Sequence, residues 1–108
     1  MSLEPIVDQP THDAAVNAAS KSNPIIIYVY SDANPVCQRT TPKIEDLAQK
    51  YAGRIKFYKM ELTQKTQPMI KFSVSNTPIL ITMNGASCAT FLGGDVRSLG
   101  GEIEKMLS

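Results

Sequence analysis

Cys37 carries the side chain most clearly capable of covalent chemistry in this 108-residue sequence. Cys37 ends the segment Asn34-Pro35-Val36-Cys37, which follows an apolar run and opens a helical pattern. A thiol near a helix N-terminus ionises more readily, because the partial positive charge of the helix end stabilises the thiolate. Cys37 is therefore a candidate nucleophile or a thiol sensitive to oxidation. The alternative is a small, partly buried cysteine near the helix start, and both interpretations stay open.

Asn34 has a structural use of its own. Asparagine is among the best N-cap residues, because its side-chain oxygen accepts a backbone N–H of the first turn. Pro35 then occupies the first helical position, where the missing N–H costs nothing. The four residues are thus typical of a well-capped helix start that carries one thiol.

The other candidate residues favour structural roles. His12 lies in a helical pattern, where we expect it to be solvated, and a single histidine cannot build a histidine metal cluster. Cys88 lies in a strand pattern, where we expect it to pack in the core or on the sheet. Two cysteines are too few for a disulfide scaffold. We therefore predict neither a metal site nor a cofactor.

Composition narrows the class of protein. The chain is 43% hydrophobic and 19% charged, which is enough apolar surface for one hydrophobic core. Its net charge of +1 gives no excess of positive charge for binding nucleic acid or an anionic membrane surface. No run approaches the roughly 20 apolar residues of a membrane span. The N-terminal residues lack the basic and apolar regions of a signal peptide. We expect a single domain over residues 1–108, a cytoplasmic location, and neither nucleic acid nor membrane as a partner.

Hydrophobic patterning predicts the elements that position these residues. Residues 25–30 form an uninterrupted β-branched and aromatic run, typical of a central strand buried on both faces. Other strands are expected at residues 3–7, 55–60, 79–83 and 87–92. Helices are expected at residues 11–20, 35–51, 64–72 and 96–107. Thr11 is the expected N-cap of the first helix and Asp95 that of the last. Alternation of strand and helix implies parallel pairing, to which an Asn84-Gly85 hairpin adds antiparallel strands. The expected fold is α/β, with a mixed sheet of four to five strands and about four helices.

Landmarks along nearly the whole chain resemble the thioredoxin family. They are the segment Asn34-Pro35-Val36-Cys37 after the central strand, Pro42 five residues beyond Cys37, Asn76-Thr77-Pro78 in place of the family's cis-proline loop, the Asn84-Gly85 hairpin, and Phe91-Leu92-Gly93-Gly94 as its late glycine turn. The resemblance implies a thioredoxin fold, a cis peptide bond before Pro78, and a position for Cys88 far from Cys37, so that we expect no disulfide between the two.

The departures from the family pattern bear on function. Thioredoxins carry W-C-G-P-C, whereas here Ala33 stands at the tryptophan and Asn34 at the attacking cysteine. Tyr28 stands at the family's buried aspartate, and Lys59 keeps the lysine that faces it. Dithiol–disulfide exchange needs one thiolate to attack and a second thiol to resolve the mixed disulfide. Since Asn34 has no sulfur, only the resolving position remains, and we do not expect an active dithiol–disulfide oxidoreductase.

The resemblance therefore implies binding rather than turnover. The expected partner is a protein or peptide segment, held by main-chain hydrogen bonds in the family's groove. The residues expected to line that groove are Ala33, Asn34, Asn76, Thr77, Pro78 and Gly93. The alternative is a monothiol or glutathione-linked protein of cell redox homeostasis that uses Cys37. A third hypothesis is an adaptor or subunit domain without small-molecule chemistry.

Overall fold

The computed structural model describes residues 3–20, 22–64, 66, 77–84, 88–92 and 96–107. Within these residues the chain forms three helices and one five-stranded sheet. In chain order the elements are β1 (Leu3–Pro5), α1 (Gln9–Ala18), β2 (Ile25–Tyr30), α2 (Pro35–Lys50), β3 (Lys56–Glu61), β4 (Ile79–Met83), β5 (Cys88–Leu92) and α3 (Val96–Leu107).

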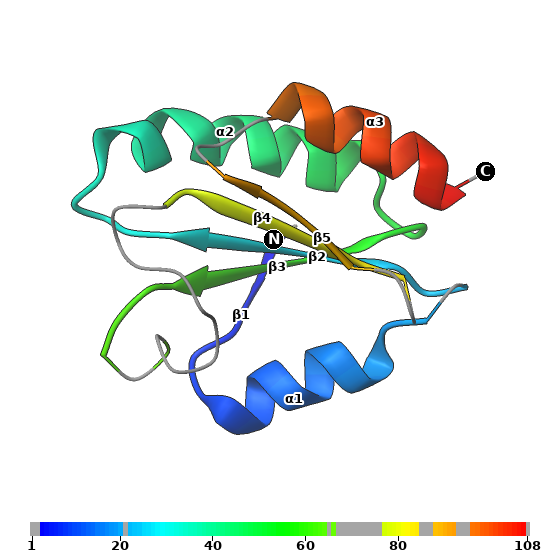
Figure 1. The fold of residues 1–108 in the computed structure, drawn as a ribbon, viewed down its shortest axis with the longest axis horizontal. Helices are drawn as coiled ribbons and strands as arrows, with labels where there is room; N and C mark the ends of the chain where they lie inside the picture. The colour runs from blue at the N-terminus through cyan, green and yellow to red at the C-terminus, as the bar shows by residue number, and fades with distance from the viewer. Residues whose placement is uncertain are drawn as a thin grey trace.

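The sheet is mixed, as predicted, and its strand order is β1-β3-β2-β4-β5. The strands β1, β3 and β2 are parallel, while β4 runs antiparallel to β2 and β5 antiparallel to β4. Helix α1 lies on one face of the sheet, and α2 and α3 cover the other face (Figure 1). Pro5 ends the edge strand β1, which fits its lack of a backbone N–H for a ladder.

The central strand β2 is buried on both faces, because successive side chains point to opposite sides of a sheet. Ile26 and Tyr28 belong to the hydrophobic cluster under α2 and α3, whereas Ile25, Ile27 and Val29 belong to the cluster against α1. All five side chains are at most 2% exposed. This double burial explains the absence of polar alternation in the strand's sequence.

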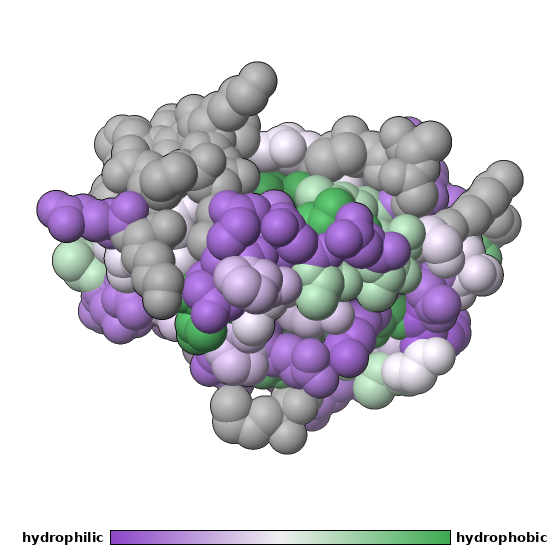
Figure 2. All heavy atoms as spheres, turned by 90° about the horizontal axis from the view of Figure 1, so that it is seen from below, coloured by the Kyte–Doolittle hydropathy of each residue, from purple (hydrophilic) through white to green (hydrophobic). Residues whose placement is uncertain are grey.

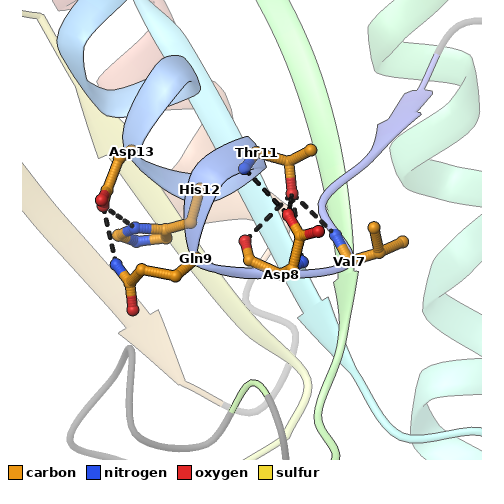
Figure 3. Close-up of polar contacts among 6 residues, drawn as sticks. All are labelled: Val7, Asp8, Gln9, Thr11, His12 and Asp13. Carbon is orange, nitrogen blue, oxygen red and sulfur yellow. Dashed lines mark hydrogen bonds and ion pairs between the residues drawn. The ribbon is translucent and has the colours of Figure 1, made fainter.

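Helix α1 begins earlier than the sequence patterning predicts. Its N-cap is Asp8, not Thr11, and the side chain of Asp8 accepts the backbone N–H of Thr11 at 3.0 Å. Thr11 Oγ1 in turn accepts the backbone N–H of Asp8 at 3.1 Å, which completes a capping box (Figure 3). Pro10 is accommodated because the N–H groups of a first turn have no helical partner.

The first turn of α1 also holds a small polar cluster on its outer side. Gln9 donates its amide to Asp13 at 2.7 Å, and His12 Nδ1 lies 3.2 Å from the same carboxylate oxygen (Figure 3). The hydrogen bond from Gln9, followed by that from His12, lowers the pKa of Asp13. The side chain of His12 is only 16% exposed, so the expectation of a solvated histidine was wrong.

Strand boundaries differ from the prediction by one or two residues. Ile55 lies before β3 because its backbone N–H donates to the carbonyl of Tyr51 at 3.0 Å, at the end of α2. The edge strand β1 ends at Pro5 rather than at residue 7, although Ile6 still donates to the Lys59 carbonyl at 2.8 Å. The predicted helix at 64–72 falls almost wholly outside the described residues, as do Gly85 and the predicted cap Asp95.

Hydrophilic and hydrophobic residues are interspersed on the α1 side of the molecule, among the residues coloured in Figure 2. That view therefore offers no single broad apolar patch as a docking surface. Among the described residues, the helices are all too short or too polar to cross a bilayer.

Candidate binding site at the start of α2

The backbone brings two distant segments together at one end of the sheet. Strand β2 ends at Tyr30 and α2 begins at Pro35, so the intervening turn lies beyond the carboxyl end of the central strand. Strand β4 runs antiparallel to β2 with Ile79 opposite Val29, which places the residues before β4 beside this turn. The peptide bond between Thr77 and Pro78 is cis.

The side chain of Asn34 connects these two segments. Its Oδ1 accepts the backbone N–H of Val36 at 2.9 Å, as expected for an N-cap. Its Nδ2 donates to the Thr77 carbonyl oxygen at 3.0 Å and lies 3.3 Å from Thr77 Oγ1. Asn34 is half-buried, whereas Thr77 is only 4% exposed. We call this pair of contacts from Nδ2 the Asn34–Thr77 contact.

Cys37 lies in the first turn of α2 with its thiol directed into the protein. The residue is 2% exposed, and its Sγ accepts the backbone N–H of Ser31 at 3.4 Å. Of the two cysteines, only Cys37 has a described side chain, and its thiol is free. The structure therefore places this thiol under the turn rather than on its surface.

A cluster of hydroxyl groups surrounds the Cys37 carbonyl. The Tyr28 hydroxyl donates to this oxygen at 3.0 Å and lies 2.9 Å from Thr41 Oγ1, which itself donates to the same carbonyl at 2.9 Å. The hydroxyl of the buried Tyr28 is thus bonded to the backbone of the helix start. Burial raises the pKa of Tyr28 to about 12, so the phenol stays neutral at physiological pH.

Lys59 pairs in register with Tyr28 on the neighbouring strand. Its half-buried side chain borders a cavity of about 190 Å³ at the carboxyl ends of the parallel strands. Tyr30 and Glu61 border the same cavity. The negative charge of the nearby Asp32 raises the pKa of Glu61.

Most of the predicted site residues with described positions lie together. Ala33 and Pro35 are exposed, Val36 is half-buried, and Pro78 is buried behind Thr77. Asn76 and Gly93, which we also expected in the groove, lie outside the described residues. No set of three metal-ligating side chains gathers within the described part of the chain.

Sequence reasoning missed the second role of Asn34. The cap uses only the amide oxygen, which leaves an NH₂ group with two hydrogens to place. A loop from the distant Thr77 supplies the acceptor, and such a contact across 43 positions leaves no local pattern in the sequence. The surplus donor of a capping asparagine was the available signal.

Comparison with known proteins assigns the family. The sequence profile described as Thioredoxin matches residues 5–105. Thioredoxin M2, chloroplastic, of Arabidopsis thaliana is 29% identical over 82% of this chain and 47% of its own length. Thioredoxin C-2 of Corynebacterium nephridii is 23% identical over 86% of this chain and 87% of its own length. The chain thus spans about half of the first relative and most of the second.

Solved structures agree with this fold. Thioredoxin f from spinach chloroplast, in its short form, superimposes with a TM-score of 0.83 at 20% identity, covering 98% of this chain and 94% of the other. Thioredoxin O2 from Arabidopsis thaliana in the oxidised state gives a TM-score of 0.78 at 24% identity, covering 96% and 93%. With the profile match over nearly the full length, these likenesses establish that the chain belongs to the thioredoxin family.

Proposed function

We propose that this thioredoxin-family domain binds an extended protein segment and does not turn over disulfides. The observation that carries the proposal is the place of Asn34. It stands three residues before Cys37 at the start of α2, and its amide spans from the helix to Thr77. A side chain without sulfur holds the position from which a dithiol enzyme would attack its client.

The chemistry of exchange supports this reading. A thiolate attacks a client disulfide, and a second thiol of the enzyme must then break the mixed disulfide. Cys37 supplies one sulfur, which is 2% exposed and held by the Ser31 N–H. A buried thiol cannot bring its sulfur in line with a client disulfide unless the helix start moves. Electron transfer therefore lacks both a partner thiol at position 34 and access at position 37.

The binding part of the proposal rests on the two segments that meet at the site. The end of the turn and the start of α2 present the exposed Ala33 and Pro35, on either side of the Asn34 that contacts Thr77. Backbone groups next to such a loop pair with an extended chain by main-chain hydrogen bonds, which need no thiol. Ala33 leaves the approach open, because a small side chain replaces the bulky tryptophan of related motifs. Asn76 and Gly93, which the sequence predicts in the same groove, lie outside the described residues.

Insulin reduction tests the redox part of this proposal. With dithiothreitol as electron donor, we expect the wild-type chain to accelerate insulin precipitation no more than the C37S variant does. The N34C variant restores two thiols at the spacing Cys-x-x-Cys and should gain measurable activity, which serves as the positive control. Robust turnover by the wild-type chain would reject the proposal.

The rival function, monothiol or glutathione-linked chemistry at Cys37, depends on access to its sulfur. Burial predicts that native Cys37 reacts with iodoacetamide about 100-fold more slowly than in urea, because labelling must wait for local opening. Peptide mass mapping separates this thiol from Cys88. Native labelling as fast as that of a free cysteine would favour the rival over the binding function.

A further inference from the structure

We propose that this protein has a second binding site, which takes a small amphipathic carboxylate in a cleft at the amino ends of the parallel strands. The cleft has a volume of about 530 Å³. It lies at the end of the sheet opposite the Asn34–Thr77 contact, because β2 and β3 are parallel and both begin beside it. The site is separate from the proposed groove for an extended segment and does not depend on that function.

Three parts of the fold border this cleft. Helix α1 reaches it with its last residue, Ala18, and α2 reaches it with Ala48 and the turn that follows the helix. The starts of β2 and β3 lie between them, where Ile25 pairs in register with Lys56. Figure 1 shows the ends of both helices and the starts of both strands on the same side of the molecule.

The inner wall of the cleft is apolar and fixed in position. Ile25, Ala48, Ile55 and Phe57 border the cleft and are each at most 4% exposed, so the packing of the core holds them in place. The mouth is open at the turn after α2, since a Cβ atom added at Gly53 would meet no atom within 4 Å. Cavities of about 300–1,000 Å³ with preformed apolar walls are typical of small-molecule sites.

The charged residues of the cleft favour a ligand with one negative charge. Arg54, Lys56 and Glu4 border it, so the cations exceed the carboxylate by one charge. Lys56 is already paired, because its Nζ lies 3.2 Å from Glu4 Oε1 and 5.7 Å from the centre of the Tyr58 ring. A monoanion therefore neutralises the cleft, whereas a dianion leaves an excess of negative charge beside Glu4.

Arg54 is the group that we assign to the ligand's carboxylate. Its guanidinium carbon lies 5.0 Å from the centre of the Tyr51 ring, which attracts the positive charge. In the described part of the chain, the side chain of Arg54 makes no ion pair and no hydrogen bond. A guanidinium donates two parallel hydrogen bonds to a carboxylate, while the apolar body of the ligand lies against the inner wall.

Three variants separate the guanidinium from the general positive charge and from the space in the cleft. Arg54→Gln removes the guanidinium. Lys50→Gln is the matched control, because Lys50 also lies over the Tyr51 ring, at 5.4 Å, but does not border the cleft. Ala18→Leu keeps every charge and lengthens a side chain at the rim. All three residues are exposed, and thermal unfolding checks that the variants remain folded.

The ligands tested are naphthoate, which carries one carboxylate on a rigid apolar body, and naphthamide, which has nearly the same shape without the charge. Amide NMR titration at neutral pH follows binding, and naphthoate should shift the signals of Gly53, Arg54 and Lys56 saturably. We expect naphthamide to bind the wild type about tenfold more weakly than naphthoate, because it lacks the charge-assisted hydrogen bonds.

The variants should respond differently to the two ligands. Arg54→Gln should weaken naphthoate binding about tenfold and leave naphthamide binding unchanged, because only the carboxylate uses the guanidinium. Lys50→Gln should change neither affinity, and Ala18→Leu should weaken both. Each result is a ratio of dissociation constants measured under the same salt conditions.

Several outcomes would overturn the inference. Equal weakening by Arg54→Gln and Lys50→Gln would mean that naphthoate responds to positive charge in general and not to Arg54. Naphthamide binding as tightly as naphthoate would exclude a carboxylate as the recognised group. If neither naphthoate nor the flexible octanoate shifts the three signals, the cleft is not a site for this class of ligand. The proposed binding of an extended segment at the other end of the sheet would stand in every case.

Discussion

Two hydroxyl groups converge on one carbonyl oxygen in the first turn of α2. Tyr28 and Thr41 both donate to the Cys37 carbonyl, which gives the helix start a polar tie to the central strand. The position that the family resemblance gives to a buried acid thus holds a neutral phenol. Proton transfer near neutral pH is not available to a group whose pKa is raised to about 12.

Replacing Tyr28 with phenylalanine tests this tie. We expect Tyr28→Phe to lower the free energy of unfolding by about 1 kcal/mol at pH 8, the usual worth of one buried hydrogen bond. Thr41 still serves the Cys37 carbonyl, so the loss stays modest. Urea unfolding measures the change, and a loss as large as that of a core cavity would contradict this account.

The same variant should also change how the free energy of unfolding depends on pH in the alkaline range. The folded-state pKa of Tyr28 lies near 12, above its ordinary value of 10.0. Between these values the unfolded chain releases the proton and the folded chain keeps it, so stability falls as pH rises. Tyr28→Phe removes this contribution and should flatten the fall in stability from pH 10 to pH 12. An unchanged slope in urea titrations across this range would show that Tyr28 is not buried as described.

Helix α1 illustrates how a cap determines an element's start. Asp8 and Thr11 exchange side-chain and backbone hydrogen bonds, and Pro10 lies between them in the first turn. We expect Asp8→Ala to lower the free energy of unfolding by about 1 kcal/mol, because the N–H of Thr11 loses its acceptor. Asp8→Asn keeps an acceptor and is the matched control. Equal losses in the two variants, measured by urea unfolding, would exclude capping as the cause.

Elements were predictable where hydrophobic burial dictates the pattern, and less so where local hydrogen bonds set the boundary. The run at β2 and the strand β4 were predicted with their observed bounds, because both are buried almost throughout. The start of α1 was misplaced because Asp and Thr are both favourable N-cap residues, and Pro10 is tolerated in the first turn after Asp8. The β-branched side chain of Ile55 favoured a strand in the prediction. Its backbone N–H instead donates to the Tyr51 carbonyl at the end of α2.

At the scale of the whole molecule, β2 joins two hydrophobic clusters. Ile27 belongs to the cluster against α1, and Ile44 to the cluster under α2 and α3. Because Tyr28, the neighbour of Ile27 in β2, belongs to the cluster that contains Ile44, adjacent residues of one strand serve both clusters. Neither face can therefore lose its packing without disturbing the other. The domain should therefore unfold as one cooperative unit, as small single domains usually do.

Two core truncations test this cooperativity. We expect Ile27→Ala and Ile44→Ala each to lower the free energy of unfolding by about 2–5 kcal/mol, from lost burial and the cavity left behind. In each variant, circular dichroism and tyrosine fluorescence should report the same urea midpoint. Separate midpoints for the two probes would mean that the two faces unfold independently.

The site was predictable only in part, because some of its contacts join segments that are distant in the sequence. The capping role of Asn34 follows from its neighbours in sequence, but its donation to Thr77 depends on how β4 lies against β2. The burial of Cys37 likewise depends on the turn at Ser31 folding back over the helix start. Contacts between distant segments are products of the assembled sheet, which residue types and spacing do not specify.

Pro35 also affects how Asn34 ages. An asparagine deamidates in neutral solution when the backbone nitrogen of the next residue attacks the side-chain carbonyl, closes a five-membered imide and releases ammonia. That route needs a hydrogen on the attacking nitrogen, and proline has none. Asn34 is therefore spared the conversion to aspartate, whereas Asn84, followed by Gly85, has no such protection. Stored protein should acquire its extra negative charge at the β4–β5 connection long before the amide of Asn34 is lost.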